Sequence, residues 1–237
     1  KEPMEVGPTT HYAMGGIRVN GDTQATNVPG LFAAGECAAG LHGANRLGGN
    51  SLSDLIVFGK RAGEFAAKFA KENSQGQIND AQVEAAYKEA VAPFERTGGG
   101  SNEGPYQVQY DLQNMMQANV GIVRLQKEME FALDGIQKLK ERAAKVAVQG
   151  HLEYNPGWHT SIDLKHLLTV SEAITICSLG RKESRGGHFR EDFPNKDPEG
   201  AKYNSVIFKQ ADGSMQLRRE PIPAMPEHLK QVIEEMK

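Results

Sequence analysis

The residues best suited to chemistry lie in a glycine-rich loop that leads into an apolar helix, at residues 41–52. The loop carries His42 and Arg46, with glycines on both sides of the arginine. A guanidinium group is always charged and presents its donors in a fixed fork, and glycines let the backbone come close to a ligand. The start of the following helix adds free N–H groups and the positive end of its dipole. The loop therefore predicts an anion-binding site built around Arg46.

Two shorter motifs precede this loop. The segment 30–36 reads as a buried strand that ends in a lone carboxylate, Glu36, and the ends of such strands are where α/β sheets bind ligands. The segment 11–16 places His11 next to paired glycines. We expect the three motifs to form one ligand site. The residues alone leave open whether His11 binds the ligand or is structural, and whether His42 orients Arg46, orients the ligand or packs against the loop.

The composition is that of an ordinary globular protein. The chain has 237 residues, 39% hydrophobic and 24% charged, with a net charge of −3, which allows one or two domains and gives no electrostatic footprint for nucleic acid. Cys37 and Cys177 are far apart, so we expect two small buried residues and neither a disulfide scaffold nor a metal site. No apolar run approaches the ~20 residues of a membrane span. Because the chain starts Lys-Glu-Pro, we expect it to be an internal piece of a longer protein.

The elements that must position these residues change in character along the chain. Residues 1–72 combine strands and loops with one helix capped by Asn50 or Ser51, as at the end of an α/β dinucleotide-binding domain. Residues 73–182 predict a helical bundle: a helix that ends at Pro93, a glycine-rich loop at 97–105, and helices over 106–116, 122–146 and 162–177. Residues 183–237 predict a tail with one short strand at 205–208.

Five segments of the chain resemble the flavoprotein subunit of succinate dehydrogenase and fumarate reductase. They are 11–16, 30–36, 42–51, 183–188 and 190–194, and they follow the order found in that family. The resemblance covers only the C-terminal portion of the family, without the glycine fingerprint that follows its first strand. It implies a fold made of an α/β remnant of an FAD-binding domain, an all-α helical bundle and an extended C-terminal tail, with FAD as the cofactor.

The resemblance also implies a role for each candidate residue. Arg46 and His11 match the residues that bind the two carboxylates of the substrate, and a guanidinium fork suits a carboxylate. Glu36 matches the residue that accepts hydrogen bonds from FAD hydroxyls. Ser51 and Leu52, at the helix N-terminus, match positions that contact the flavin ring. The proton-transfer arginine of the family is expected upstream, so no catalytic residue is assigned in this chain.

The function implied for the intact protein is the interconversion of succinate and fumarate by hydride transfer to FAD. Electrons would leave through an iron–sulfur subunit next to membrane-anchor subunits, with the flavoprotein peripheral on the cytoplasmic face of a bacterial plasma membrane. Two other interpretations remain open. L-Aspartate oxidase shares the fold and the His-Gly-Ala-Asn-Arg loop at 42–46, and the isolated chain could be a non-catalytic module that docks other subunits.

The missing fingerprint predicts that the 237-residue chain alone is inactive and does not retain FAD. Purified after expression with excess riboflavin, it should show no stoichiometric absorbance in the visible flavin bands. A full-length flavoprotein prepared in parallel is the positive control. One flavin per chain in the 237-residue protein would show that its pocket is complete.

Overall fold

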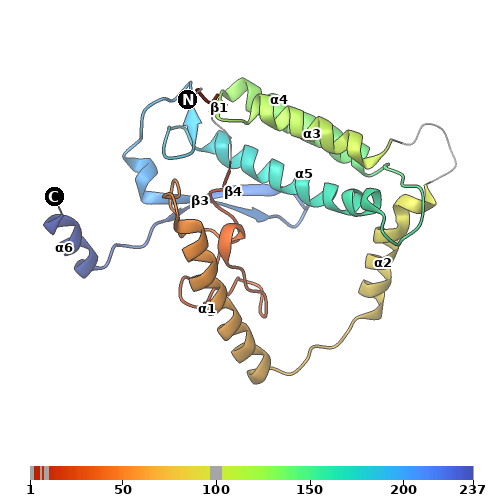
Figure 1. Cartoon of the computed structure of the whole chain (residues 1–237), viewed down its shortest axis with the longest axis horizontal. Coiled ribbons are helices and arrows are strands. Elements are labelled where there is room, and N and C mark those ends of the chain that lie inside the picture. Colours follow the sequence, from red (N-terminus) through yellow and green to blue (C-terminus); the bar gives the residue numbers. More distant parts are fainter. Residues whose placement is uncertain (1–2, 6, 8–10, 97–102, 237) are drawn as a thin grey trace. The chain divides into compact units, whose positions relative to one another are not determined.

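A computed structural model describes residues 3–5, 7, 11–96 and 103–236 (Figure 1). The chain divides into two compact units. The first contains residues 1–95 and 185–189, and the second contains residues 96–184 and 190–237. The domain boundaries at 72 and 182 stay a prediction. Among the described residues, no helix is both long enough and apolar enough to cross a membrane.

The first unit consists of a looped segment and two helices. A 3-10 turn, Gly35–Cys37, is followed by α1, Asn50–Glu72, and α2, Asp80–Glu95. The prediction that Pro93 ends the second helix is wrong, because α2 continues through Pro93 for two more residues. Pro93 lies in the last turn, so its missing N–H and the steric conflict of its ring affect only the end of the helix.

The buried strand expected at 30–36 does not form in the described chain. Phe32 makes a single isolated bridge to Ala25, and Glu36 lies in the 3-10 turn. Gly30 and Gly35 adopt φ values of 83° and 78°, which are incompatible with extended backbone at both ends of the segment. The expectation that Cys37 is buried is wrong, because Cys37 is exposed at the end of the 3-10 turn.

The second unit contains three packed helices (Figure 1): α3, Pro105–Asn119; α4, Gln126–Ala143; and α5, Pro156–Gly180. Leu112, Ile136 and Leu164 meet in their common core. The predicted break near residue 120 is confirmed, since α3 ends at Asn119 before the two-residue strand β1, Val123–Arg124. The glycine-rich loop predicted at 97–105 falls largely outside the described residues. The helical bundle of the predicted fold class is therefore confirmed.

The C-terminal segment holds more regular structure than a tail. The short strand β2, Phe189–Arg190, pairs with β1, and a 3-10 turn at Glu199–Lys202 precedes β3, Tyr203–Lys209. β3 pairs antiparallel with β4, Met215–Pro221, from Tyr203↔Pro221 to Lys209↔Met215. The predicted strand at 205–208 is thus confirmed within β3. The helix α6, Glu227–Glu235, was not predicted, because Pro221, Pro223 and Pro226 before it indicate extended chain.

A buried arginine links two helix ends in the second unit. Arg190 is fully buried, and its Nε and Nη2 donate to the two carboxylate oxygens of Asp192 at 2.7 and 2.6 Å. Its Nη1 donates to the carbonyl of Ser178 in the last turn of α5. Asp192 also accepts from the N–H of Gln126 at the start of α4 at 3.1 Å. These charge-assisted bonds lower the pKa of Asp192 and satisfy groups that helix ends leave unpaired.

Two leucines of α5 allow the same substitution to be compared at a buried and at an exposed position. Leu164 is 1% exposed and Leu167 is 38% exposed. Leu164→Ala should reduce the free energy of unfolding by about 2–5 kcal/mol, because it leaves a cavity between three helices. Leu167→Ala carries the same chemical change and should cost less than about 1 kcal/mol. Urea denaturation of both variants measures the difference, and equal losses would contradict the packing described here.

Candidate functional site

The glycine-rich loop ends at an open helix N-terminus. α1 begins at Asn50, and the capping position is Gly49, with φ of 84°, one residue before the expected Asn50 or Ser51. In the described chain no side chain caps this end, and its first turn carries no acidic residue. A Cβ built on Gly48 or Gly49 would meet no atom within 4 Å. The N–H of Asn50 donates to the carbonyl of Leu47 at 3.2 Å, and no side chain neutralises the positive partial charge of the remaining helix start.

Arg46 is held over an aromatic ring. Its Cζ lies 4.7 Å from the centroid of the Tyr12 ring, and its Nη1 donates to the carbonyl of Leu47 at 3.2 Å. Its Nε is buried and has no hydrogen-bond partner among the described residues. A buried donor without a partner is costly, so the guanidinium retains a capacity for an anion that the described chain does not use.

Tyr12 in turn contacts a buried carboxylate. Its hydroxyl donates to Oδ2 of Asp54 at 3.1 Å and lies 3.3 Å from Nε2 of His42. His42 Nε2 also lies 3.3 Å from Asp54 Oδ2. Across the described residues of α1, Asp54 alone is buried. Burial, followed by the hydrogen bond to Asp54 and that residue's charge, raises the pKa of Tyr12, so its hydroxyl stays a donor near neutral pH.

Glu36 joins the first motif to the second. Its Oε1 accepts from the N–H of Ala13 at 2.9 Å. The backbones run together beyond this point, because Ile17 donates to Cys37 at 2.7 Å and Ala39 donates to Ile17 at 2.8 Å. Glu36 and His11 are both exposed. The segment that carries His11 therefore lies along the turn that carries Glu36.

A segment from far along the chain supports the loop. Residues 185–189 belong to the first unit, where Gly187 donates to the carbonyl of Ala44 at 3.0 Å. Gly186 has φ of 58°, and a Cβ on it would lie 2.1 Å from the same carbonyl oxygen. Only glycine fits this approach, so Gly186 sets how closely the segment packs against the loop.

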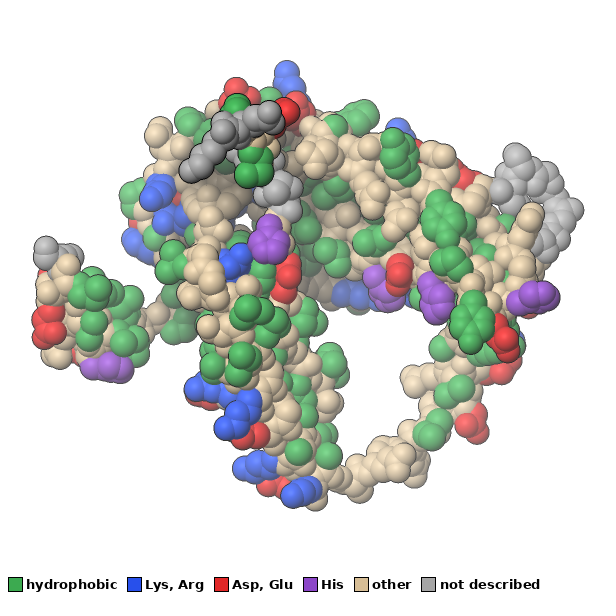
Figure 2. Space-filling view, in the orientation of Figure 1, with side chains coloured by type: hydrophobic (Ala, Val, Ile, Leu, Met, Phe, Trp, Pro, Cys, Tyr) green, Lys and Arg blue, Asp and Glu red, His purple; other side chains and the backbone are tan. Residues whose placement is uncertain are grey.

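All five predicted site residues lie in the first unit. Arg46 and His11 are linked through Tyr12, which follows His11 in sequence and lies under the guanidinium. Ser51 is half-buried and Leu52 is 68% exposed, both in the first turn of α1. Figure 2 shows hydrophobic side chains over the N-terminal half of α1 and charged ones toward its C-terminal end. The open helix start therefore combines free amides with an apolar surface.

Sequence reasoning missed two members of this cluster, Tyr12 and Asp54. Asp54 had a detectable signal, since it is a carboxylate directly before the apolar run at residues 55–58 of the helix. Tyr12 had none of its own, because a tyrosine beside a histidine does not indicate a contact with a loop that starts 29 positions later at Leu41. Only the fold brings its ring beneath Arg46.

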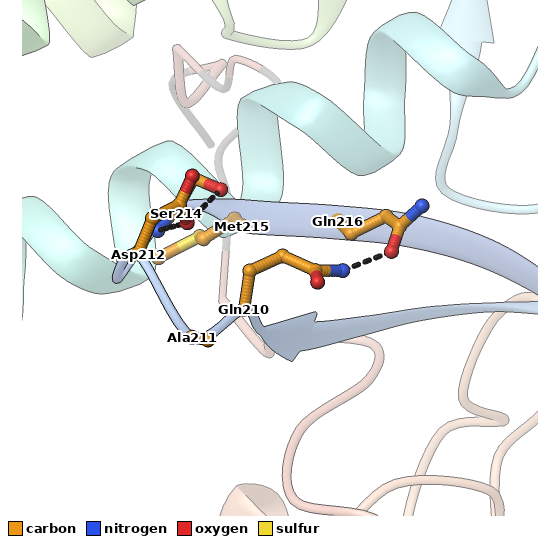
Figure 3. Close-up of a pocket in the computed structure, with 6 residues that line it drawn as sticks. All are labelled: Gln210, Ala211, Asp212, Ser214, Met215 and Gln216. Carbon is orange, nitrogen blue, oxygen red and sulfur yellow. Dashed lines mark hydrogen bonds between the residues drawn. The ribbon is translucent and has the colours of Figure 1, made fainter.

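A surface depression also lies at the turn between β3 and β4 (Figure 3). Ser214 donates to Asp212 Oδ1 through its N–H at 2.9 Å and through its hydroxyl at 2.7 Å, and Gln210 bonds to Gln216. The side-chain and backbone hydrogen bonds from Ser214 lower the pKa of Asp212. The polar groups of the turn thus satisfy one another on an open surface, and the arrangement around Arg46 is the better candidate for a ligand site.

Comparisons with known proteins match both parts of the chain. Residues 109–233 match the family described as fumarate reductase flavoprotein C-term, and residues 1–52 match the family described as FAD binding domain. The fumarate reductase flavoprotein subunit of Haemophilus influenzae is 37% identical over 224 residues. That alignment covers 93% of this chain and 37% of the relative, so the chain spans little more than a third of the relative's length.

Solved structures show the same similarity. Sdh1 of Mycobacterium smegmatis in complex with UQ1 superposes with a TM-score of 0.91 and 44% identity, over 98% of this chain and 39% of that one. A mutant quinol fumarate reductase of E. coli superposes with a TM-score of 0.85 and 34% identity, over 95% of this chain and 39% of that one. The fold of the whole described chain is therefore shared with these proteins.

The close approach at Gly186 predicts that alanine substitution destabilises the protein much more at Gly186 than at Gly187. Gly186→Ala should lower the free energy of unfolding by about 1–3 kcal/mol, because a left-handed φ and the carbonyl of Ala44 both oppose a Cβ. Gly187→Ala is the matched control. Its Cβ would lie 3.9 Å from that carbonyl, and the change should stay within about 0.5 kcal/mol. Denaturant titrations that rank the two variants equally would refute the close approach.

Proposed function

Because this chain belongs to the succinate dehydrogenase and fumarate reductase flavoprotein family, we propose that it forms one wall of the site that interconverts succinate and fumarate. The observation that carries the proposal is the state of Arg46. Its guanidinium is fixed over Tyr12, uses Nη1 on the carbonyl of Leu47, and keeps Nε without a partner among the described residues. Such a group is prepared to receive an anion.

The substrate of the proposed reaction is a dicarboxylate, which needs two cationic or donor groups. Arg46 binds one carboxylate through its fork of N–H donors. His11 binds the other, from an exposed position next to the tyrosine that supports Arg46. The two groups come from different motifs that the fold joins through Tyr12. The proton-transfer residue belongs to the part of the protein that this chain does not include.

FAD is the cofactor of this family, and the described residues fit it. The uncapped start of α1 offers free N–H groups and positive partial charge to the electron-rich edge of a flavin, and Leu52 offers an apolar surface. Glu36, with Oε1 on Ala13, remains exposed to accept from ligand hydroxyls. Bound FAD would supply the hydride-transfer chemistry that interconverts succinate and fumarate. The part of this chain is to hold the substrate carboxylates and stabilise negative charge at the flavin.

The intact protein is proposed to work in a complex. Electrons would pass between its flavin and an iron–sulfur subunit, and membrane-anchor subunits would hold the flavoprotein peripherally on the cytoplasmic face of the membrane. The similar structures support this scheme, since one is Sdh1 in complex with UQ1 and the other is a quinol fumarate reductase. The 237-residue chain alone remains proposed to be inactive.

Replacing Arg46 tests the substrate assignment in a full-length flavoprotein that contains this chain. Arg46→Lys keeps the charge but removes the bidentate fork. We expect kcat/KM for fumarate reduction to fall by about 100-fold or more, as for the loss of charge-assisted hydrogen bonds worth roughly 3 kcal/mol. Arg61→Lys, at an exposed position on α1, should change it less than about twofold.

The same enzyme preparation separates the two candidate activities. It should oxidise succinate or reduce fumarate and leave L-aspartate unchanged. Oxidation of aspartate without any turnover of succinate or fumarate would establish L-aspartate oxidase in place of the proposed function. Full activity of Arg46→Lys on fumarate would show that Arg46 is structural.

A further inference from the structure

The strongest unassigned feature is the cluster of Tyr12, His42 and Asp54 behind Arg46. Tyr12 is its centre, because one face of its ring supports the guanidinium while its hydroxyl contacts both other residues. The rings of Tyr12 and His42 also meet edge to face, with centroids 5.3 Å apart and planes at 83°. The ring of Tyr12 therefore contacts Arg46 and His42, and its hydroxyl contacts His42 and Asp54.

Asp54 explains why the cluster is fixed. Its carboxylate is 4% exposed, and a buried charge must be paired or hydrogen-bonded. The partners come from two different segments: Tyr12 from the first motif and His42 from the glycine-rich loop. Asp54 thus fastens both segments to the second turn of α1. This anchorage determines where the plane of the Tyr12 ring lies.

The ring plane matters because Arg46 is planar. The Arg46 Cζ lies 4.7 Å over the Tyr12 ring, where the cation–π attraction holds it, and its Nη1 donates to the carbonyl of Leu47. The two contacts fix the direction in which the remaining N–H donors point. Small errors in this direction weaken carboxylate binding, because two parallel N–H···O bonds form only when the guanidinium fork faces the carboxylate.

We propose that Tyr12 is a positioning residue that orients Arg46 toward the substrate carboxylate, and that Asp54 and His42 hold Tyr12 in place for this task. The inference rests on the proposed function, since it assumes that Arg46 binds a carboxylate. Tyr12 does not act as a proton carrier here. Burial and Asp54 hold the pKa of its hydroxyl above the ordinary value, although Arg46 opposes the shift.

The test uses the full-length flavoprotein with FAD bound and malonate as the probe. Malonate has two carboxylates but only one carbon between them, so it can be neither reduced nor oxidised as fumarate and succinate are. Its Kd, measured through the change in flavin absorbance, therefore reports binding alone. Tyr12→Leu removes the aromatic face, and we expect the Kd to rise about tenfold, which corresponds to about 1.4 kcal/mol. Tyr12→Phe keeps the ring but loses the anchoring hydroxyl, and we expect a rise of about threefold.

Three measurements distinguish positioning from a general structural role. In Tyr12→Leu, KM for fumarate should rise with the malonate Kd while kcat changes less than about threefold. Tyr110→Leu, at an exposed tyrosine of α3, should leave both constants unchanged. In an Arg46→Lys background, Tyr12→Leu should weaken malonate binding less than about twofold, because a compact ammonium group does not depend on a flat support.

Each result decides between the two proposals. If the unsubstituted enzyme neither binds malonate nor reduces fumarate, the proposed function fails and the role of Tyr12 falls with it. If it does both and Tyr12→Leu leaves the malonate Kd unchanged, only the positioning role is wrong. The full tenfold loss in the Arg46→Lys background would also overturn that role. Should Tyr12→Leu fail to retain FAD, an unchanged Kd in Tyr12→Phe overturns the anchorage.

Discussion

A buried carboxylate has to be paired, and in the first unit this constraint falls on Asp54. The cost of an unpaired charge away from water exceeds the gain from any single surface contact. Tyr12 and His42 meet that requirement with contacts of 3.1 and 3.3 Å. Because these partners lie on separate segments, pairing one charge on α1 assembles the surroundings of Arg46. The site thus depends on an interaction that itself touches no ligand.

In the second unit the buried charge that must be paired is positive. Arg190 is fully buried and pairs with Asp192, while the pair also satisfies a carbonyl at the end of α5 and an N–H at the start of α4. Leu112, Ile136 and Leu164 supply the apolar contacts of the helices, and the ion pair ties their ends. Burial of apolar area favours many arrangements of helices, whereas directional bonds to helix ends favour one.

The helices were predictable because their signals are local. Apolar spacing located α4 and α5, and the break between α3 and α4 coincides with the expected one at residue 120. The strand expected at 30–36 failed because a strand depends on its partners as well as on its own residues. Its glycines take positive φ, and among the described residues only Ala25 bridges to it. α6 was missed because nearby prolines indicated extended chain up to its first turn.

The sequence by itself determined which chemical groups are available: a guanidinium between glycines, a histidine in each of two motifs, a carboxylate at Glu36 and a helix that starts directly after the glycines. These follow from residue type and short spacing. Tertiary structure alone decided that Tyr12 lies under Arg46, that Asp54 is buried, and that Gly187 donates to Ala44. The physical reason is that these contacts join residues far apart in the sequence. Contacts between distant segments arise when burial and pairing are satisfied together across a whole unit, and no local pattern records that balance.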